Sequence, residues 1–212
     1  MLETSHLVDM SVYKWLLDPG HGGIVAGKYV TAPRKMFTFP DGKVIQEGVV
    51  NRGITFRLIN KLEAAGIEFR DIVDANDDVA LSVRVNRADA EYMKDKRCIF
   101  LSIHSNAGGG SGNEIYTSRG QTKSDKIANI FCEVYQKLFP QFKFRAEQVD
   151  GDADKEADFY VLRKTDCPAL LVENLFFDNR KEAEFLLSAE GQEAFAECLF
   201  QAIVKVETLK PV

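Results

Sequence analysis

The sequence predicts an α/β fold in which helices cover a mostly parallel sheet. Apolar runs rich in β-forming residues alternate with longer segments of helical periodicity, and this alternation is typical of strand-helix-strand units. The chain has 212 residues, 45% hydrophobic and 28% charged, without an internal repeat, a low-complexity tail or a linker rich in Pro, Ser and Gly. A chain of this length can bury about 70% of its unfolded surface in one core. We therefore expect a single domain over residues 1–212.

Five strands are expected, each from an apolar run. The strands of a parallel sheet are buried on both faces, so their sequences need not alternate between apolar and polar residues. The runs lie at residues 12–17, 67–73, 98–103, 114–117 and 169–172. The segments between them are long enough to hold helices or long loops.

Four helices are expected between and after these strands. The clearest covers residues 47–65, where five apolar side chains fall on one face and Gly66 supplies a C-terminal stop. These side chains are Val50, Ile54, Leu58, Ile59 and Leu62. The other helices are expected at residues 81–94, at 124–139 before Pro140, and at 192–206.

Charge and cysteine spacing disfavour several classes of protein. The formal net charge of −5 gives no electrostatic reason to expect a nucleic-acid partner. No stretch approaches the roughly 18 apolar residues of a membrane helix, and the first ten residues do not resemble a signal peptide. The cysteines are widely spaced without a CxxC pair, which indicates buried free thiols rather than a thiolate zinc site or a disulfide framework. They are Cys98, Cys132, Cys167 and Cys198.

Two histidines follow predicted strands directly. His21 lies in WLLDPGHGG at residues 15–23, and His104 lies in SIHSNAGGG at residues 102–110. Ligands of open α/β sheets bind beyond the carboxyl ends of the strands, where both imidazoles are expected. For one histidine alone a hydrogen-bonded turn residue is the simpler interpretation, but the matched pair favours a functional site. The glycines around His21 indicate a tight turn or the close approach of another group to the backbone.

A third ligand is needed for an open zinc site, because catalytic zinc usually keeps three protein ligands and one water. Glu47, in IQEGVVNRGI at residues 45–54, is the candidate. It stands at the start of the predicted helix, where a carboxylate also stabilises the helix dipole by about 0.3–1 kcal/mol. From the residues alone both roles stay open.

An apolar strand runs directly into Glu173, within CPALLVENLFFDN at residues 167–179. Burial raises the pKa of a carboxyl group toward the range in which it transfers protons at neutral pH. Beside a zinc ion, such a carboxylate could take a proton from water and pass it to a leaving amine. The alternative interpretation of Glu173 is an ion pair at a strand end.

Five motifs, in order, resemble the zinc-dependent N-acetylmuramoyl-L-alanine amidases of the Amidase_3 type. They are LLDPGHGG, EGVVNRGI, LSVRVNRADA, LSIHSNA and VLRKTDCPALLVENLFFDN. The resemblance covers about residues 12–206 and implies a Rossmann-like sheet of about six strands with helices on both faces. It also implies zinc held by His21, Glu47 and His104. The catalytic glutamate of the family falls on Glu173.

The resemblance implies hydrolysis of the amide bond between N-acetylmuramic acid and L-alanine of peptidoglycan, with Glu173 as general acid and base and Zn²⁺ as cofactor. The expected partner is the glycan strand with its stem peptide, with no nucleic acid, no membrane and no separate wall-binding domain, and the chain is expected to be a monomer. Two other functions stay open: a zinc peptidase acting within stem peptides, and a non-catalytic wall-binding module. The complete set of ligands and Glu173 favours an enzyme over the module.

The loop at residues 24–46 makes the spacing from His21 to Glu47 longer than in compact members of the family. The cationic and aromatic side chains of this loop could line a groove for a glycan and stem peptide, or the segment could be a surface hairpin. The side chains are Lys28, Tyr29, Arg34, Lys35, Phe37 and Phe39.

A second long loop, at residues 141–158, contains three alternating acids, Asp150, Asp152 and Asp154. The spacing is that of an EF-hand, but Lys155 stands where the turn glycine belongs and Val161 where the bidentate glutamate belongs. An EF-hand is therefore excluded. We expect a solvated acidic loop, with substrate contact possible because the strand of Glu173 follows it.

Four further residues are expected to position the site or its ligands without binding the metal. Arg84 and Asn86 are expected to fix their helix against the site, and Asn106 to orient a ligand or a group behind it. Asp18 could cap the turn or accept a hydrogen bond from a ligand imidazole. The missing signal peptide indicates a phage or prophage lysin released from the cytoplasm, or an exported enzyme whose signal has been removed.

Overall fold

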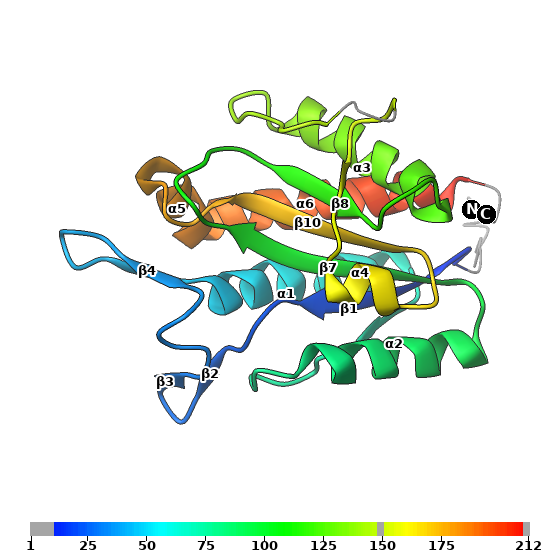
Figure 1. Cartoon of the computed structure of the whole chain (residues 1–212), viewed down its shortest axis with the longest axis horizontal. Coiled ribbons are helices and arrows are strands. Elements are labelled where there is room, and N and C mark those ends of the chain that lie inside the picture. The colour runs from blue at the N-terminus through cyan, green and yellow to red at the C-terminus, as the bar shows by residue number, and fades with distance from the viewer. Residues whose placement is uncertain (1–10, 148–150, 210–212) are drawn as a thin grey trace, which may run out of the picture.

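The computed structural model describes residues 11–147 and 151–209 and has a six-stranded sheet at its centre (Figure 1). The strand order is β6-β1-β7-β10-β8-β9. Strands β6, β1, β7 and β10 run parallel, β8 is antiparallel to β10, and β9 pairs parallel with β8. The bounds are β1 (Lys14–Pro19), β6 (Phe69–Asp71), β7 (Cys98–Asn106), β8 (Glu114–Thr117), β9 (Lys155–Glu156) and β10 (Ala169–Phe176). The predicted fold class is confirmed, and β9 is the strand of this sheet that no apolar run had predicted.

Helices cover both faces of this sheet (Figure 1). The helices α1 (Glu47–Ala65), α3 (Lys123–Leu138) and α6 (Ala189–Glu207) pack on one face. The helices α2 (Leu81–Lys94) and α4 (Tyr160–Lys164) pack on the other, and α5 (Arg180–Leu187) contacts α6 and β10. The helices predicted at 47–65 and 81–94 have those bounds. The helices α4 and α5, of 5 and 8 residues, are too short to show a clear helical period.

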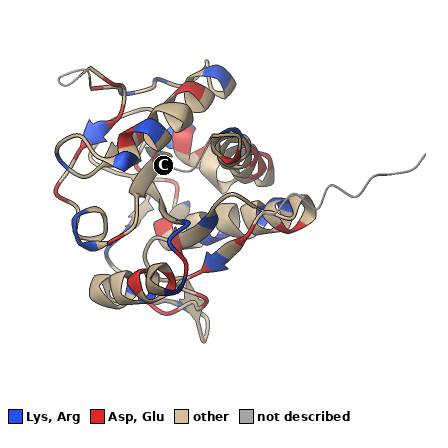
Figure 2. Ribbon diagram, turned by 90° about the vertical axis from the view of Figure 1, so that its right-hand side faces the viewer, with Lys and Arg blue, Asp and Glu red and all other residues tan. Residues whose placement is uncertain are grey.

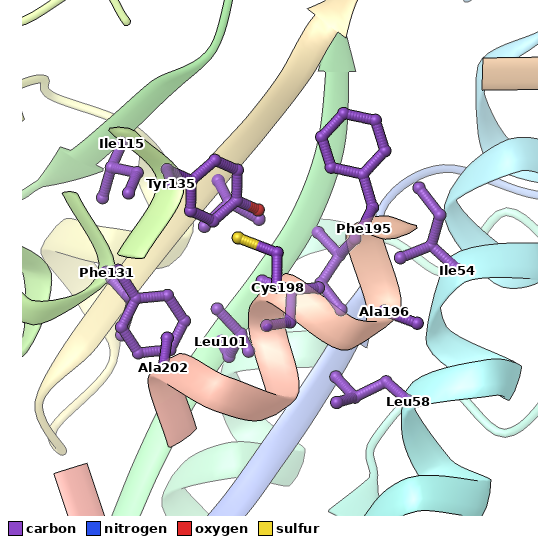
Figure 3. Close-up of a cluster of buried hydrophobic side chains, with 14 of the residues drawn as sticks. Ile54, Leu58, Leu101, Ile115, Phe131, Tyr135, Phe195, Ala196, Cys198 and Ala202 are labelled. Atoms are coloured by element: carbon purple, nitrogen blue, oxygen red, sulfur yellow. The ribbon is translucent and has the colours of Figure 1, made fainter. Parts of the chain in front are cut away.

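The core divides at the sheet because successive residues of a strand point to opposite faces. Trp15 and Leu17 of β1 belong to the larger apolar cluster, whereas Leu16 belongs to the smaller one under α2 and α4. In the larger cluster α6 lies between α1 and α3, with Phe195 and Cys198 among their side chains (Figure 3). The four cysteines are buried and free, as predicted.

The ends of two helices are fixed by local signals. Gly66 ends α1 in the left-handed region with φ 68°, as the sequence predicts. Thr122 caps α3 by accepting a hydrogen bond from the Ser124 N–H at 3.0 Å. The Asp125 carboxylate accepts a hydrogen bond from the Thr122 N–H in return, which completes a capping box.

The segment between His21 and Glu47 folds into two hairpins. The first pairs β2 (Ile24–Val25) with β3 (Lys28–Tyr29), and the second pairs β4 (Met36–Thr38) with β5 (Val44–Gln46). The hairpin interpretation of this loop is therefore correct. The two hairpins lie between the residues His21 and Glu47 of the predicted site.

Charged residues of both signs are interspersed over the helices and loops (Figure 2), in keeping with the small net charge of −5. Within residues 11–147 and 151–209, no helix combines the length and the apolar character needed to cross a membrane.

Candidate active site

The carboxyl ends of β1 and β7 bring His21 and His104 together, and α1 begins beside them with Glu47. Glu47 Oε1 lies 3.0 Å from His104 Nδ1 and 3.1 Å from His21 Nε2. The two imidazole rings stand nearly perpendicular, at 86°, with centroids 4.9 Å apart. The structure thus places the three predicted ligands around one point.

Two atoms of this group, His21 Nε2 and Glu47 Oε2, are buried without a hydrogen-bond partner in the part of the chain that the structure describes. Lys35 Nζ lies 3.9 Å from Glu47 Oε2, beyond hydrogen-bond distance. Buried polar atoms are rarely left unpaired, and two imidazoles with one carboxylate form a donor set of catalytic zinc. Donor atoms that share a tetrahedral zinc at about 2.0–2.1 Å lie about 3.3 Å apart, close to the distances found here. The three residues therefore fit a zinc ion.

Burial and the shared carboxylate shift the pKa values of this group. Burial lowers the pKa of His21. At His104 burial also lowers the pKa, but the hydrogen bond and charge of Glu47 outweigh it and raise the pKa above its usual value. Burial opposes the ionised form of Glu47, yet the close approach of the His104 and His21 imidazoles holds the pKa of this carboxyl well below its usual range. The carboxylate of Glu47 is thus ionised and ready to bind a cation.

The glycines around His21 allow both close approach and a tight turn. A Cβ at Gly20 would lie 2.1 Å from Cε1 of His104, and a Cβ at Gly48 would lie 1.9 Å from the carbonyl oxygen of Gly22. His21 itself has φ 63°, in the region that L-residues rarely adopt. The two interpretations offered by the sequence are therefore both correct.

Replacing Gly48 by Ala is expected to destabilise the fold by about 1–3 kcal/mol, because the Gly22 carbonyl belongs to the backbone and the start of α1 must move. The shift would also loosen Glu47 from the histidines and weaken zinc binding by about 10- to 100-fold. Gly53→Ala, in the same helix, is the matched control because its Cβ would meet only the flexible Gln192 side chain. Urea unfolding and zinc titration measure both effects. Equal behaviour of the two variants would contradict the prediction.

Two buried residues that the sequence analysis did not single out hold Glu47 in place. Asn51 Nδ2 lies 3.3 Å from the Gly20 carbonyl oxygen and 3.4 Å from Glu47 Oε1. The Ser105 N–H also donates to Glu47 Oε1 at 3.4 Å, and its hydroxyl donates to Asn51 Oδ1. The signal for Asn51 was available, because residues four apart share one face of a helix.

Asp18 and Arg84 form a buried ion pair beneath His21. Arg84 Nη1 donates to Asp18 Oδ1 at 2.5 Å, and the Ser102 hydroxyl donates to Asp18 Oδ2 at 2.6 Å. Neither role predicted for Asp18 is correct, since its carboxylate meets a guanidinium instead of a turn N–H or an imidazole. Arg84 also donates to the carbonyl oxygens of Pro19 and His21. This confirms that Arg84 fixes α2 against the site, whereas Asn86 is exposed and that part of the prediction was wrong.

Glu173 faces the histidines from β10. Its Cα is paired with His104 on β7 and with Glu114 on β8. Burial raises the pKa of Glu173 to about 8, and within residues 11–147 and 151–209 its buried Oε2 has no hydrogen-bond partner. The neighbouring Glu114 carries the ion pairs at this edge, to Arg145 and Lys155 at 2.6 Å each. Glu173 has no such ion pair among the described residues.

A bulge follows Glu173 in β10, between Glu173 and Phe176. Inside it the buried Asn174 donates to the His104 carbonyl oxygen at 3.0 Å and accepts from the Tyr135 hydroxyl at 2.7 Å. Bulges redirect side chains near functional sites, and this one links the strand of Glu173 to the backbone of His104. Asn106, expected to orient a ligand, donates to Glu114 instead.

A cavity of about 460 Å³ opens over these residues. His21, His104 and Glu173 line it, as do Arg34 and Lys35 from the loop at 24–46. The other residues proposed for that groove are not in the lining: Tyr29 and Phe39 are buried, and Lys28 and Phe37 are exposed elsewhere. Sequence reasoning missed the aromatic Phe159 and Tyr160, which line the cavity at the start of α4. The described acids Asp152 and Asp154 are not part of it.

The chain is similar to known proteins over most of its length. Residues 16–205 match the family Amidase_3, N-acetylmuramoyl-L-alanine amidase. N-acetylmuramoyl-L-alanine amidase CwlM of Bacillus licheniformis is 32% identical over 180 residues, which are 83% of this chain and 61% of that protein. The endolysin of Bacillus phage SPP1 is 26% identical over 211 residues, which are 95% of this chain and 68% of that protein. The solved N-acetylmuramoyl-L-alanine amidase AmiC2 of Nostoc punctiforme superposes with a TM-score of 0.70 at 26% identity, covering 93% of this chain and 98% of that chain.

This chain spans 61% of the length of CwlM, so the comparison with that protein concerns one part of it. The family match begins within β1 and ends within α6, and it includes His21, Glu47, His104 and Glu173. Taken with the site geometry and the shared fold, this match shows that the chain belongs to the Amidase_3 family of N-acetylmuramoyl-L-alanine amidases.

Proposed function

We propose that this chain hydrolyses the amide bond between N-acetylmuramic acid and L-alanine of peptidoglycan, with Zn²⁺ as cofactor. The observation that carries the proposal is that His21 and His104, which are grouped with the buried Glu47, line one cavity together with Glu173. Membership of the amidase family supports this reaction class. The proposed partner is therefore the bacterial cell wall, through its glycan strand and stem peptide.

His21, Glu47 and His104 would hold the ion, which when bound would polarise the scissile carbonyl and lower the pKa of water toward about 7. Glu173 takes one proton from the attacking water as the new carbon-oxygen bond forms. It then returns that proton to the alanine nitrogen as the carbon-nitrogen bond breaks. The raised pKa of Glu173 suits both steps, because a group that titrates near the working pH can accept a proton and release it again.

Other residues of the cavity supply binding and positioning. Arg34 and Lys35 line it with positive charge that can meet carboxylates of the stem peptide. Phe159 and Tyr160 offer aromatic surface suited to the apolar faces of sugar rings. Arg84 acts from behind, since it holds the His21 backbone by its carbonyl oxygen at 3.1 Å.

Product analysis tests the proposed bond. Purified peptidoglycan is incubated with the zinc-loaded protein, and the soluble products are examined by mass spectrometry. We expect new free L-alanine amino termini, no new reducing sugar ends, and loss of the reaction after zinc is removed with restoration when zinc returns. Reducing ends alone would overturn the proposal. Cleavage only between stem-peptide residues would instead identify a zinc peptidase, and wall binding without products or zinc would identify a binding module.

A further inference from the structure

A second group of carboxylates lies outside the active-site cavity, between the start of α3 and the segment that leads into β9. It consists of Asp125, Asp152 and Asp154, and one carboxylate oxygen from each lies within 4.8 Å of the others. None of the three lines the active-site cavity. Asp150, the other acid of the predicted loop, lies outside the described residues.

Asp154 is the central residue of this group because it is buried. Its exposed fraction is only 3%, so the expectation of a solvated loop was wrong at this position. Its Oδ2 accepts a hydrogen bond from the Thr117 hydroxyl at 2.7 Å, whereas its Oδ1 is buried with no hydrogen-bond partner among the described residues. A buried carboxylate oxygen without a partner is costly and calls for an explanation.

The neighbouring charges increase that cost. Burial raises the pKa of Asp154, the Thr117 hydrogen bond opposes the rise, and the negative charges of Asp152 and Asp125 add to it, so that the pKa reaches about 7. Two arrangements would relieve this group: a proton held between carboxylates, or a cation bound among them.

We propose that Asp125, Asp152 and Asp154 bind a Ca²⁺ ion. Carboxylate oxygens without imidazole or thiolate favour a hard cation over zinc. Oxygens that surround Ca²⁺ at about 2.3–2.6 Å can lie up to about 5 Å apart, and one carboxylate oxygen from each residue of this group lies within 4.8 Å of the others. Backbone carbonyls and water complete such sites, since Ca²⁺ takes about 6–8 oxygen ligands in flexible geometry. The Oδ1 atom of Asp154, which has no hydrogen-bond partner in the described structure, can serve as one of the metal ligands.

The ion would join two segments that are distant in the sequence. Asp125 belongs to the capping box of α3, and Asp152 and Asp154 precede β9 at the edge of the sheet. From β9 the chain continues to Phe159 and Tyr160, which line the active-site cavity. Ca²⁺ therefore fixes the segment that positions one side of the cavity, without touching the zinc ligands.

Thermal unfolding with added Ca²⁺ tests the site. The full chain is first loaded with one equivalent of zinc, so that His21, Glu47 and His104 are occupied. We expect about 5 mM CaCl₂ to raise the unfolding midpoint by about 5 °C or more and equilibrium dialysis with ⁴⁵Ca to show one ion per chain. The expected midpoint shift with Mg²⁺ is smaller, because Mg²⁺ demands near-ideal octahedral geometry.

Isosteric variants locate the ion. Asp154→Asn and Asp152→Asn are expected to abolish the Ca²⁺ shift, while Asp154→Asn without Ca²⁺ folds normally because the amide keeps the shape and removes the buried charge. Asp158→Asn is the matched control: this acid lies in the same segment, is 61% exposed and pairs with Arg163. The control should keep the full shift. No shift and no bound ⁴⁵Ca in the original chain, or a shift that persists in both variants, would overturn the proposal.

Discussion

Replacing Glu173 by Gln is expected to lower the rate of L-alanine release from peptidoglycan by about 10²- to 10⁴-fold. The amide has nearly the same shape but cannot take a proton from water or return one to the leaving nitrogen. Glu173 is outside the group of three proposed ligands, so the variant should still bind one zinc per chain. Rates are measured by quantifying new amino termini, and zinc by elemental analysis. Glu184→Gln, at an exposed acid in α5, is the control and should keep full activity.

Two outcomes would contradict these roles. Loss of zinc from Glu173→Gln would make Glu173 a ligand, and retained activity would place the proton transfer elsewhere. A stability measurement adds an independent check in the metal-free protein. Burial raises the pKa of Glu173 from 4.5 to about 8, so above pH 4.5 the unfolded chain loses this proton before the folded chain does. The free energy of unfolding of the metal-free protein should therefore fall as the pH rises from 4.5 toward 8. The Glu173→Gln variant, which has no carboxyl group at this position, should not show this fall.

Arg84→Met is expected to lower the free energy of unfolding by about 3–5 kcal/mol, because it leaves the charge of Asp18 buried without its partner. Arg84 and Asp18 are 2% and 1% exposed, so water cannot replace the guanidinium. The variant also loses the hydrogen bonds to the Pro19 and His21 carbonyl oxygens, so zinc affinity should fall together with stability. Urea unfolding and zinc titration provide both measurements.

The same helix offers a control for this change. Arg87, also in α2, is 43% exposed in its ion pair with Asp74, and Arg87→Met should cost at most about 1 kcal/mol. Adding Asp18→Asn to Arg84→Met should recover part of the loss, because the second change removes the unpaired charge. If Arg84→Met and Arg87→Met lowered the free energy of unfolding by similar amounts, the buried Arg84–Asp18 pair would contribute no more to stability than the exposed pair.

The sequence predicted those parts of the molecule that depend on local periodicity. The apolar stripe of the helix at 47–65 and the glycine that ends it are both visible in the sequence. The structure has the helix with these bounds and Gly66 at its end. The convergence of His21 and His104 followed from their positions after two apolar runs, since parallel strands end at one edge. Glu47 was already a ligand candidate from the residues alone, but its role at the helix start stayed open until the ordered motifs of the family favoured the ligand role.

The parts that the sequence did not predict depend on long-range pairing. Nothing local indicates that Asp18 meets Arg84, which is 66 positions away, or that Asp154 is buried against Thr117. The polarity of a residue predicts exposure only on average, and a partner from another element can reverse it. The sequence also does not indicate the bulge that follows Glu173, because the apolar residues there are typical of a regular strand.

The two hairpins between His21 and Glu47 have a consequence for how such a protein can diversify. The positions beside them, Gly20 and Gly48, leave no room for a side chain, whereas the hairpins reach the cavity only through the segment that carries Thr31, Arg34 and Lys35. Surface loops tolerate changes in length at small entropic cost. Substrate preference can therefore be altered by exchanging residues 24–46 while the arrangement of His21, Glu47 and His104 stays unchanged.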